Sequence, residues 1–523
     1  MLSYLKIPNL RDMAPRREDI SDSSSRIARN TVMLYFRMLL MLFVGLYTSR
    51  VILRSLGVDD YGIYNAVGGL VTVFTFITGA ISTATQRFLT YEIGRGDGDR
   101  LRRVFGASVF IQILISLVLV LLVETAGARF LHHRMDIPAG RMDAASFVLH
   151  TSVAVLVLNL LSVPYNAVIL AHEKMGAYAL ISLMEAFLKL AVALLLAWSP
   201  FDKLRSYALL MLAVAFLTRL VYGIYCRRHF TESRGLPSWD PPLFSEMLSF
   251  ALWSFFGSGS YILNTQGVNV VSNLFFGVAV NAARGVATQV EGMVKLFISN
   301  MLTAFNPQIT KSWASGDRDY CFLLARKASK YAYLIILTLM LPLCLESHKL
   351  LELWLVDVPE YADLFVSLGF CTLLEMVVNP LHTIQLATGK VRRYFLLTGG
   401  VSYLLLPLVW LAFRLGAPAW SAYPLFFLVY LLTGGLRLAL VHRDTGFPVG
   451  IYLKLLLRLA AVTLCAVPLP LALRLGMPEG LPRLALVLLT SVSAVLPASW
   501  LLALTPGEKA VVRSRLGRLR KTD

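Results

Sequence analysis

Charged residues are scarce in this sequence: only 15% of its 523 residues are Asp, Glu, Lys or Arg, against about 25% in an average soluble protein. Apolar residues take their place, since 57% of the chain is hydrophobic and the mean hydropathy is +0.66. A water-soluble fold cannot bury so much apolar surface. The composition therefore excludes a cytosolic enzyme, a nucleic-acid-binding domain and a secreted disulfide scaffold, and indicates a chain that crosses a membrane many times.

Cysteine is also rare, and its spacing is uninformative. The five cysteines lie in or beside apolar runs without a CxxC pair, and they are Cys226, Cys321, Cys344, Cys371 and Cys465. Such cysteines usually act as small buried hydrophobes, so we expect neither a metal site nor a disulfide framework. No nucleotide-binding motif occurs either, because Gly257-Ser258-Gly259 lacks a strand–turn–helix context. We expect no cofactor, and a driving force from a proton or sodium gradient or from the membrane potential.

Apolar runs of about 18 residues or more divide the chain into twelve to fourteen predicted transmembrane helices, with fourteen favoured. The predicted spans are 30–53, 63–88, 104–124, 146–171, 178–198, 206–226, 247–275, 284–306, 328–346, 362–388, 394–415, 419–441, 452–474 and 483–504. The connecting loops reach about twenty residues at most, which is too short for a folded domain. We therefore expect an all-α polytopic membrane protein whose function lies in its helices.

The net charge of +18 is interpreted as an orientation signal. With both termini in the cytoplasm, the inward segments carry roughly 30 Lys and Arg residues and the outward segments about 11. This alternation predicts a multi-pass protein of the bacterial inner membrane. The expected parts are a polar cytoplasmic tail (1–29), an N-terminal lobe (30–226), a cytoplasmic linker (227–246), a C-terminal lobe (247–442), two further helices (443–504) and a basic cytoplasmic tail (505–523).

An internal repeat relates the two lobes at an offset of 216 to 220 residues. The matched positions are Gly57 with Gly277, Gly96-Asp97 with Gly316-Asp317, and Val163–Tyr178 with Asn379–Tyr394. A repeat of six spans returns the chain to its starting side, which predicts two parallel lobes with a substrate path between them. Pro164 and Pro380 match within this repeat and are candidate hinges. The alternative is the general self-similarity of multi-span sequences.

Charges inside the predicted spans are the candidate functional groups, because each costs about 2.5–3.5 kcal/mol at the centre of a bilayer. The basic ones are Arg37, Arg50, Arg87, Lys189, Arg219, Lys295, Arg437 and Arg458, and the acidic ones are Glu185, Glu291 and Glu375. Arg50, Arg87, Arg437 and Arg458 lie near span ends, from which they can extend to the headgroups. Glu185 with Lys189, and Glu291 with Lys295, have the i,i+4 spacing of an ion pair within one helix.

Two arginines have no such explanation. Arg37 lies in a helix without an acidic residue, and Arg219 lies well inside its span; Arg284 opens the eighth span. Unpaired cations facing a cavity attract an anion, and arginine binds phosphate oxygens bidentately. The seventh span is unusually polar, with Asn264, Gln266, Asn269 and Asn273 among its residues. These side chains either join helices or line a hydrated path that contacts sugar hydroxyls.

Three segments give the sequence a family resemblance: Tyr47–Phe74, Ala171–Leu190 and Asn281–Asp317. They resemble bacterial polysaccharide-export flippases of the multidrug/oligosaccharidyl-lipid/polysaccharide exporter superfamily, most of all Bacteroidetes-type members. The resemblance implies movement of an undecaprenyl-diphosphate-linked oligosaccharide across the inner membrane for surface polysaccharides such as the O-antigen of lipopolysaccharide. In the related lipid II flippases, arginines of helices 1, 2 and 8 are thought to bind the diphosphate. Arg37 and Arg284 occupy comparable helices, whereas Arg87 lies close to a helix end, and the helix 1 acid of multidrug members is missing.

The sequence thus predicts a transporter rather than an enzyme, a flippase that works by alternating access between two lobes. Arg37, Arg284, Lys189 and Arg219 are predicted to bind the diphosphate, while Glu185, Glu291, Lys295 and Glu375 are candidate coupling groups. Its expected partners are the lipid-linked oligosaccharide, the bilayer and polysaccharide polymerase or assembly proteins, with no nucleic acid. The alternatives are a cation-coupled multidrug antiporter of the same fold, a membrane-embedded glycan polymerase or ligase, and a non-catalytic scaffold.

Overall fold

The computed structural model describes residues 17–510 and residue 513, apart from 73–74, 135–136, 197, 199, 236 and 356–357. Over these residues the chain forms helices joined by short turns, and no β-strand occurs among them. The all-α prediction is therefore confirmed. Eleven helical segments of the described chain are long and apolar enough to cross a membrane. The predicted spans 63–88, 247–275 and 284–306 are not among these eleven, and residues 73–74 of the first lie outside the described residues. The count of fourteen stays a prediction.

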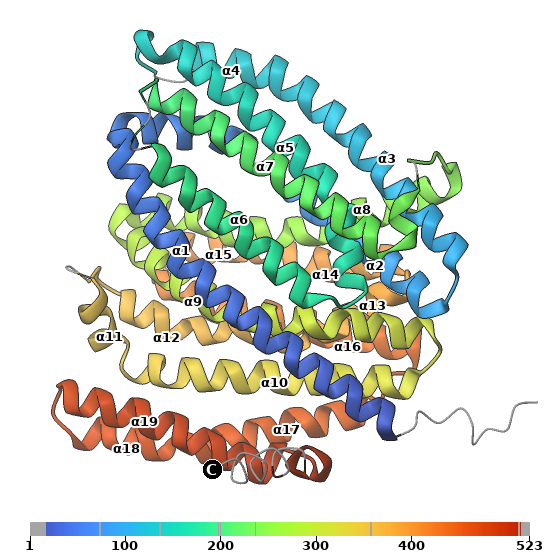
Figure 1. Cartoon of the computed structure of the whole chain (residues 1–523). Coiled ribbons are helices and arrows are strands. Elements are labelled where there is room, and N and C mark those ends of the chain that lie inside the picture. Colours follow the sequence, from blue (N-terminus) through green and yellow to red (C-terminus); the bar gives the residue numbers. More distant parts are fainter. Residues whose placement is uncertain are drawn as a thin grey trace, which may run out of the picture.

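Among the described residues the N-terminal lobe contains seven α-helices; most of them form the upper part of Figure 1, while the first helix, α1, runs diagonally to the lower right. They are α1 (Arg17–Thr72), α2 (Thr75–Arg95), α3 (Gly98–Leu122), α4 (Ala128–Arg134), α5 (Met142–Ala171), α6 (Met175–Leu196) and α7 (Lys203–His229). The helix α1 begins earlier than predicted, because Arg17–Arg29 is helical although it was assigned to a polar tail.

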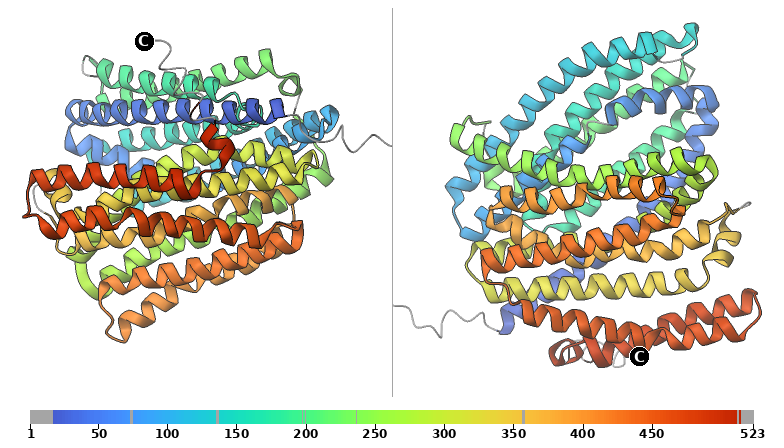
Figure 2. Two further views of the ribbon diagram at one scale, coloured as in Figure 1. Left: turned by 90° about the horizontal axis from the view of Figure 1, so that it is seen from below. Right: turned by 180° about the vertical axis from the view of Figure 1, so that it is seen from behind.

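The C-terminal lobe follows a linker of eleven residues, 230–240, which is shorter than the predicted 227–246. Its helices are α8 (Pro241–Ile262), α9 (Val268–Ala314), α10 (Arg318–Leu345), α11 (Ser347–Trp354), α12 (Ala362–Leu373), α13 (Asn379–Thr388), α14 (Val391–Tyr403), α15 (Leu405–Arg414) and α16 (Ala422–Thr445). A π-helical turn (Leu263–Gly267) joins α8 to α9. Both views of Figure 2 show the two lobes lying next to each other.

The last helices are α17 (Val449–Ala466), α18 (Pro468–Gly476) and α19 (Leu481–Ala498). They lie on the outer face of the C-terminal lobe, away from the N-terminal lobe (Figure 1). Leu337 of α10 packs in one buried cluster with Leu459 of α17, and Tyr333 shares a 2.6 Å hydrogen bond with Thr463. These three helices, where the sequence predicted two, therefore pack on the outside of the C-terminal lobe.

The backbone repeats in the two lobes where the sequence repeats. Gly57 interrupts α1 with a φ of 81°, and Gly277 interrupts α9 with a φ of 78°. Gly96 and Gly316 likewise have φ values of 75° and 85°. Because L-residues with a side chain rarely adopt this left-handed region, glycine is the expected residue at all four positions. The two lobes therefore share their left-handed glycines at matched positions.

Candidate functional site

The two lobes contact each other on the side where α1 begins, which we call the terminal side and which lies at the right of Figure 1. Arg87 near the end of α2 reaches across the boundary, where its Nε donates to Leu386 O and its Nη2 to Ala387 O, both at 3.1 Å. These carbonyls belong to the last turn of α13, where a cation is favourable. The interpretation that Arg87 extends to the headgroups is therefore wrong: its guanidinium joins the lobes.

A second contact on the terminal side involves the turn between α5 and α6. Glu173 forms a salt bridge of 2.5 Å with Lys311 of α9, and its other carboxylate oxygen accepts a hydrogen bond from Gln308. Close to it, α2 and α9 touch at Gly94, where a Cβ would lie 2.7 Å from the carbonyl oxygen of Lys311. Toward the opposite side, α3–α5 incline away from α10 and α12 (Figure 1). The structure is closed on the terminal side.

Arg37 lies where α1 of the N-terminal lobe meets α9 of the C-terminal lobe. Its Nη1 donates to Ser182 Oγ and its Nη2 to Asn300 Oδ1, both at 3.3 Å. The guanidinium carbon lies 4.5 Å from the ring centroid of Tyr178, in a cation–π contact. The buried Nε has no hydrogen-bond partner. Among the described residues no carboxylate pairs with Arg37, so only neutral groups contact its guanidinium.

The other two predicted anion ligands of the N-terminal lobe differ from each other. Arg219 of α7 has its guanidinium carbon 4.0 Å from the ring centroid of Tyr165, and no salt bridge holds it within the described chain. Lys189 of α6 pairs with Glu185 at 2.6 Å, as the i,i+4 spacing predicted, and both side chains are partly exposed. Arg219 thus has no carboxylate partner among the described residues, whereas Lys189 is paired with one.

The C-terminal lobe holds its cations more tightly. Arg284 is 6% exposed, and its Nε donates to Asn269 Oδ1 at 2.6 Å. The predicted pair of Glu291 and Lys295 is present at 3.4 Å, and Thr372 Oγ1 donates to the same carboxylate oxygen at 2.6 Å. Glu291 is therefore a buried carboxylate with two donors on one oxygen.

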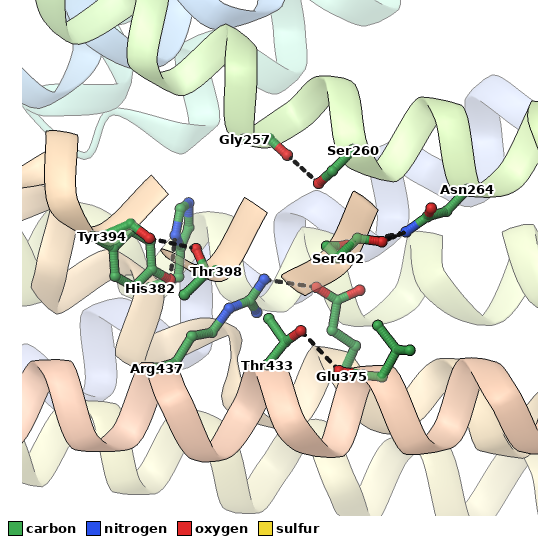
Figure 3. A network of polar contacts seen from close by, with 11 residues as sticks. Gly257, Ser260, Asn264, Glu375, His382, Tyr394, Thr398, Ser402, Thr433 and Arg437 are labelled. Atoms are coloured by element: carbon green, nitrogen blue, oxygen red, sulfur yellow. Dashed lines mark hydrogen bonds and ion pairs between the residues drawn. The ribbon is translucent and has the colours of Figure 1, made fainter. Parts of the chain in front are cut away.

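A third group of polar side chains lies between α8, α14 and α16 (Figure 3). Arg437 pairs with Glu375 at 2.8 Å, and both side chains are largely buried. The nearby His382 Nδ1 and Tyr394 OH are 2.9 Å apart. Arg437 was interpreted as extending to the headgroups, and this is wrong because a carboxylate from another helix holds it inside the lobe.

The polar residues of the seventh predicted span lie in different surroundings. Asn264 is fully buried, and its Nδ2 donates to the carbonyl oxygen and the Oγ of Ser402 at 2.9 and 3.0 Å (Figure 3). Asn269 accepts from Arg284, whereas Gln266 and Asn273 are exposed. Asn264 therefore joins two helices, whereas the side chains of Gln266 and Asn273 are exposed.

The two matched prolines produce different backbones. Pro164 lies inside α5, which continues through it from Met142 to Ala171. Pro380 lies in the first turn of α13, directly after a 3-10 turn (Leu374–Val378) that separates α13 from α12. Only the second proline therefore stands at a break between helices.

Several residues of these sites were missed by the sequence analysis. Asn300, Ser182 and Tyr178 surround Arg37, and Glu173 joins the lobes. An uncharged Asn or Ser in an apolar helix carries no distinct signal, and Arg37 and Asn300 are 263 residues apart. The acidic Glu173 was visible within the repeat, but only the fold brings Lys311 to it.

The summed charge of the predicted interior groups is positive. Arg437 is counted here because Glu375 holds it inside the lobe, and Arg87 is left out because its guanidinium lies on helix-end carbonyls at the lobe boundary. Six of the groups counted are basic and three are acidic, which leaves three positive charges: Arg37, Lys189, Arg219, Arg284, Lys295 and Arg437 against Glu185, Glu291 and Glu375. Each of the three acids has a cation within 3.4 Å. The excess charge therefore rests on Arg37, Arg219 and Arg284.

Comparison with known sequences gives one weak relative. No protein-family model matches the chain. The uncharacterized membrane protein EpsK of Bacillus subtilis (strain 168) is 21% identical over 300 residues. This match covers 57% of the chain and 59% of EpsK, so the chain spans less than two thirds of its relative.

Comparison with solved structures identifies the fold. A multidrug resistance MATE family transporter of the MOP superfamily, solved in an outward-facing conformation, superposes with a TM-score of 0.66 at 13% identity, over 81% of this chain and 97% of that one. A MOP superfamily transporter from Pyrococcus furiosus Vc1 (DSM3638) gives 0.64 at 12% identity, over 80% and 96%. Its binding pocket is described as having reverse polarity, which suggested a different function. The chain is a multi-pass membrane protein with the fold of MATE and MOP transporters.

Proposed function

We propose that the chain is a flippase that moves a lipid-linked oligosaccharide with an anionic diphosphate headgroup across the bacterial inner membrane by alternating access. The glycan is destined for surface polysaccharide, and the lipid tail stays in the bilayer while the headgroup passes between the lobes. The two-lobed fold, which is that of known transporters, supports the transport step.

The observation that carries the proposal is the absence of a carboxylate beside Arg37 and Arg219 within the described chain. A cation kept inside a membrane without a counterion is costly unless a ligand or a hydrated path stabilises it. A diphosphate offers several oxygens to which guanidinium groups bind bidentately. Arg284 supplies a third cation, while Lys189 serves more weakly because Glu185 neutralises it. Gln266 and Asn273 are the proposed sugar contacts.

The closed terminal side is one of the states that alternating access requires. Separation of Arg87 from the last turn of α13, and of Glu173 from Lys311, opens the interior to that side. The proposal places this side in the cytoplasm, so the structure corresponds to a state that is closed to the cytoplasm. Glu291 and Glu375, each paired with a buried cation, are the proposed sites where a proton or sodium ion drives the return.

The test is flipping of a fluorescent polyprenyl-diphosphate-linked disaccharide in proteoliposomes. Arg37→Gln and Arg219→Gln are each expected to reduce the rate at least about tenfold, because each removes charge-assisted hydrogen bonds of about 1.5–3 kcal/mol. Arg458→Gln is the matched control, since Arg458 in α17 is exposed and outside the lobes. Wild-type rates in both variants would reject the anionic substrate.

A multidrug antiporter of the same fold is the second candidate, favoured by the structural neighbour that carries the name of a multidrug resistance transporter. An organic cation needs an unpaired carboxylate, whereas Glu185, Glu291 and Glu375 each have a cation within 3.4 Å. Extrusion of ethidium from loaded vesicles that is lost in Glu291→Gln or Glu375→Gln would favour this candidate over the flippase.

A further inference from the structure

The edge of the Arg37 guanidinium formed by Nε and Nη2 is only half used. In arginine these two N–H groups point to the same side, where they bind two oxygens of one carboxylate or phosphate. Arg87 uses this edge on two carbonyl oxygens, and Arg141 uses it on both carboxylate oxygens of Asp60. In Arg37 the Nη2 donates to Asn300 at 3.3 Å, and the buried Nε has no partner.

Asn300 is a poor final partner for this edge. Its Oδ1 is one neutral acceptor at a long distance, and its Nδ2 is already committed to Leu296 O at 2.8 Å. Arg437 also leaves its Nε without a partner, but a carboxylate holds its Nη2 at 2.8 Å. A phosphate can therefore fill the bidentate edge of Arg37 by displacing only the amide of Asn300.

The displaced contact is also one that joins the lobes. Arg37 belongs to α1 and Asn300 to α9, and the same two helices meet again through the rings of Tyr35 and Phe297 at 5.8 Å. Lys311, which pairs with Glu173 on the terminal side, lies eleven residues further along α9, or about 16 Å. A change at Asn300 therefore acts on the helix that closes the terminal side.

We propose that Asn300 is a positioning residue that occupies the place of a phosphate oxygen on Arg37, and that a bound phosphate displaces it and weakens the contact between α1 and α9. The inference rests on the proposed function, which it deepens by linking recognition of the headgroup to opening of the closed side. Asn300 competes with the substrate, so its removal strengthens anion binding. A residue that only supported the fold would have the opposite effect.

The first experiment measures binding of inorganic diphosphate to the full chain in zwitterionic nanodiscs by titration calorimetry. Asn300→Ser keeps a hydroxyl that can bond to Leu296 O but cannot reach Arg37, and it is expected to tighten binding about threefold or more. Asn300→Asp places a competing carboxylate on Arg37 and is expected to weaken binding at least tenfold. Ser299→Asp, at an exposed neighbour, puts the same charge one residue away and is expected to change affinity less than threefold.

Arg37→Gln separates the two levels of the proposal. If the wild type does not bind diphosphate, or if Arg37→Gln binds it equally, the anion site of the proposed function is rejected together with the inference. If binding depends on Arg37 but Asn300→Ser weakens it or leaves it unchanged, the proposed function stands and the role of Asn300 is rejected.

The second experiment measures opening by the distance between spin labels at Asp99 and Asp319. These residues are exposed at matched positions of the two repeats on the terminal side. Saturating diphosphate is expected to populate longer distances in the wild type, and Asn300→Ser is expected to populate them without diphosphate. Unchanged distances in both cases would overturn the link between Asn300 and opening.

Discussion

Glu173 and Gly389 occupy the same position of the internal repeat, and both have a left-handed backbone, with φ values of 59° and 76°. Each lies in the turn that a helix end of the opposite lobe contacts: Lys311 pairs with Glu173, and the guanidinium of Arg87 lies against Gly389. The terminal side is therefore closed twice by repeat-related contacts. One contact is an ion pair, and the other is a cation on helix-end carbonyls.

Glu173→Gln is expected to shift the protein toward the open terminal side. The amide can still bond to Gln308 but loses the charge that attracts Lys311, whose side chain is mostly buried with Glu173. A loss of about 1.4 kcal/mol corresponds to a tenfold change in the open population. Spin labels at Asp99 and Asp319 measure that population. The exchange Glu173→Lys with Lys311→Glu restores the opposite charges, and a double variant as open as the single one would contradict the assignment.

Gly389→Ala is expected to destabilise the fold more than Gly446→Ala does. Both glycines have nearly the same left-handed φ, 76° and 78°, so the strain of about 1–2 kcal/mol is shared. Only at Gly389 would the new Cβ meet another group, the Nη2 of Arg87 at 2.8 Å. Thermal unfolding measures the difference between the two variants. That difference should disappear in an Arg87→Ala background, and its persistence there would exclude Arg87 as the cause.

The sequence predicted the contacts that follow from helical spacing. Glu185 with Lys189, and Glu291 with Lys295, are one turn apart, and a single helix brings each pair together whatever the fold. The repeated glycines served only as landmarks of the repeat, and their shared left-handed backbone was first seen in the structure. Contacts within one helix can be predicted from the sequence because the helical spacing alone brings the two side chains together.

Contacts between helices could not be predicted in the same way. Because Arg437 lies near the end of its predicted span, we expected its side chain to extend to the headgroups. In the structure it pairs instead with Glu375 from another part of the lobe. From the sequence, Asn264 could either line a hydrated path or join two helices. The structure shows that it joins two helices, because Ser402 lies beside it and accepts its hydrogen bonds. Both side chains satisfy the same need for a polar partner, and only tertiary packing decides which partner is present.

Asn264→Leu is expected to lower stability without lowering transport. Hydrogen bonds between membrane helices contribute about 0.6 kcal/mol on average and at most about 1.7, and this variant removes both bonds to Ser402. Thermal unfolding and flipping in proteoliposomes are the measurements. Asn273→Leu is the comparison, because the exposed side chain of Asn273 is a proposed sugar contact. This variant is expected to lower the flipping rate without lowering stability. Equal effects of the two variants would contradict the distinction.

Glu508 is expected to make the attachment of the C-terminal segment dependent on pH. Its carboxylate pairs with the buried Lys330 of α10 and accepts hydrogen bonds from Tyr331 OH at 2.9 Å and from Thr505 N at 2.8 Å. Burial raises the pKa of Glu508, but these hydrogen bonds and the charge of Lys330 outweigh it, so the pKa lies below its ordinary value. The pairing therefore stabilises the folded state fully above the ordinary pKa of about 4.3, and this contribution is lost as the pH falls through the lower pKa of the folded state.

Hydrogen exchange over residues 499–510, corrected for the intrinsic effect of pH, measures this attachment. Protection in the wild type is expected to be constant from pH 7 to about 5 and to fall below about 4.3. Glu508→Gln should exchange faster at pH 7 and show no such fall, because it has no carboxylate to protonate. Glu352→Gln is the control, since its exposed pair with Lys349 lies on α11. A parallel fall in wild type and Glu508→Gln would assign the pH dependence to another group.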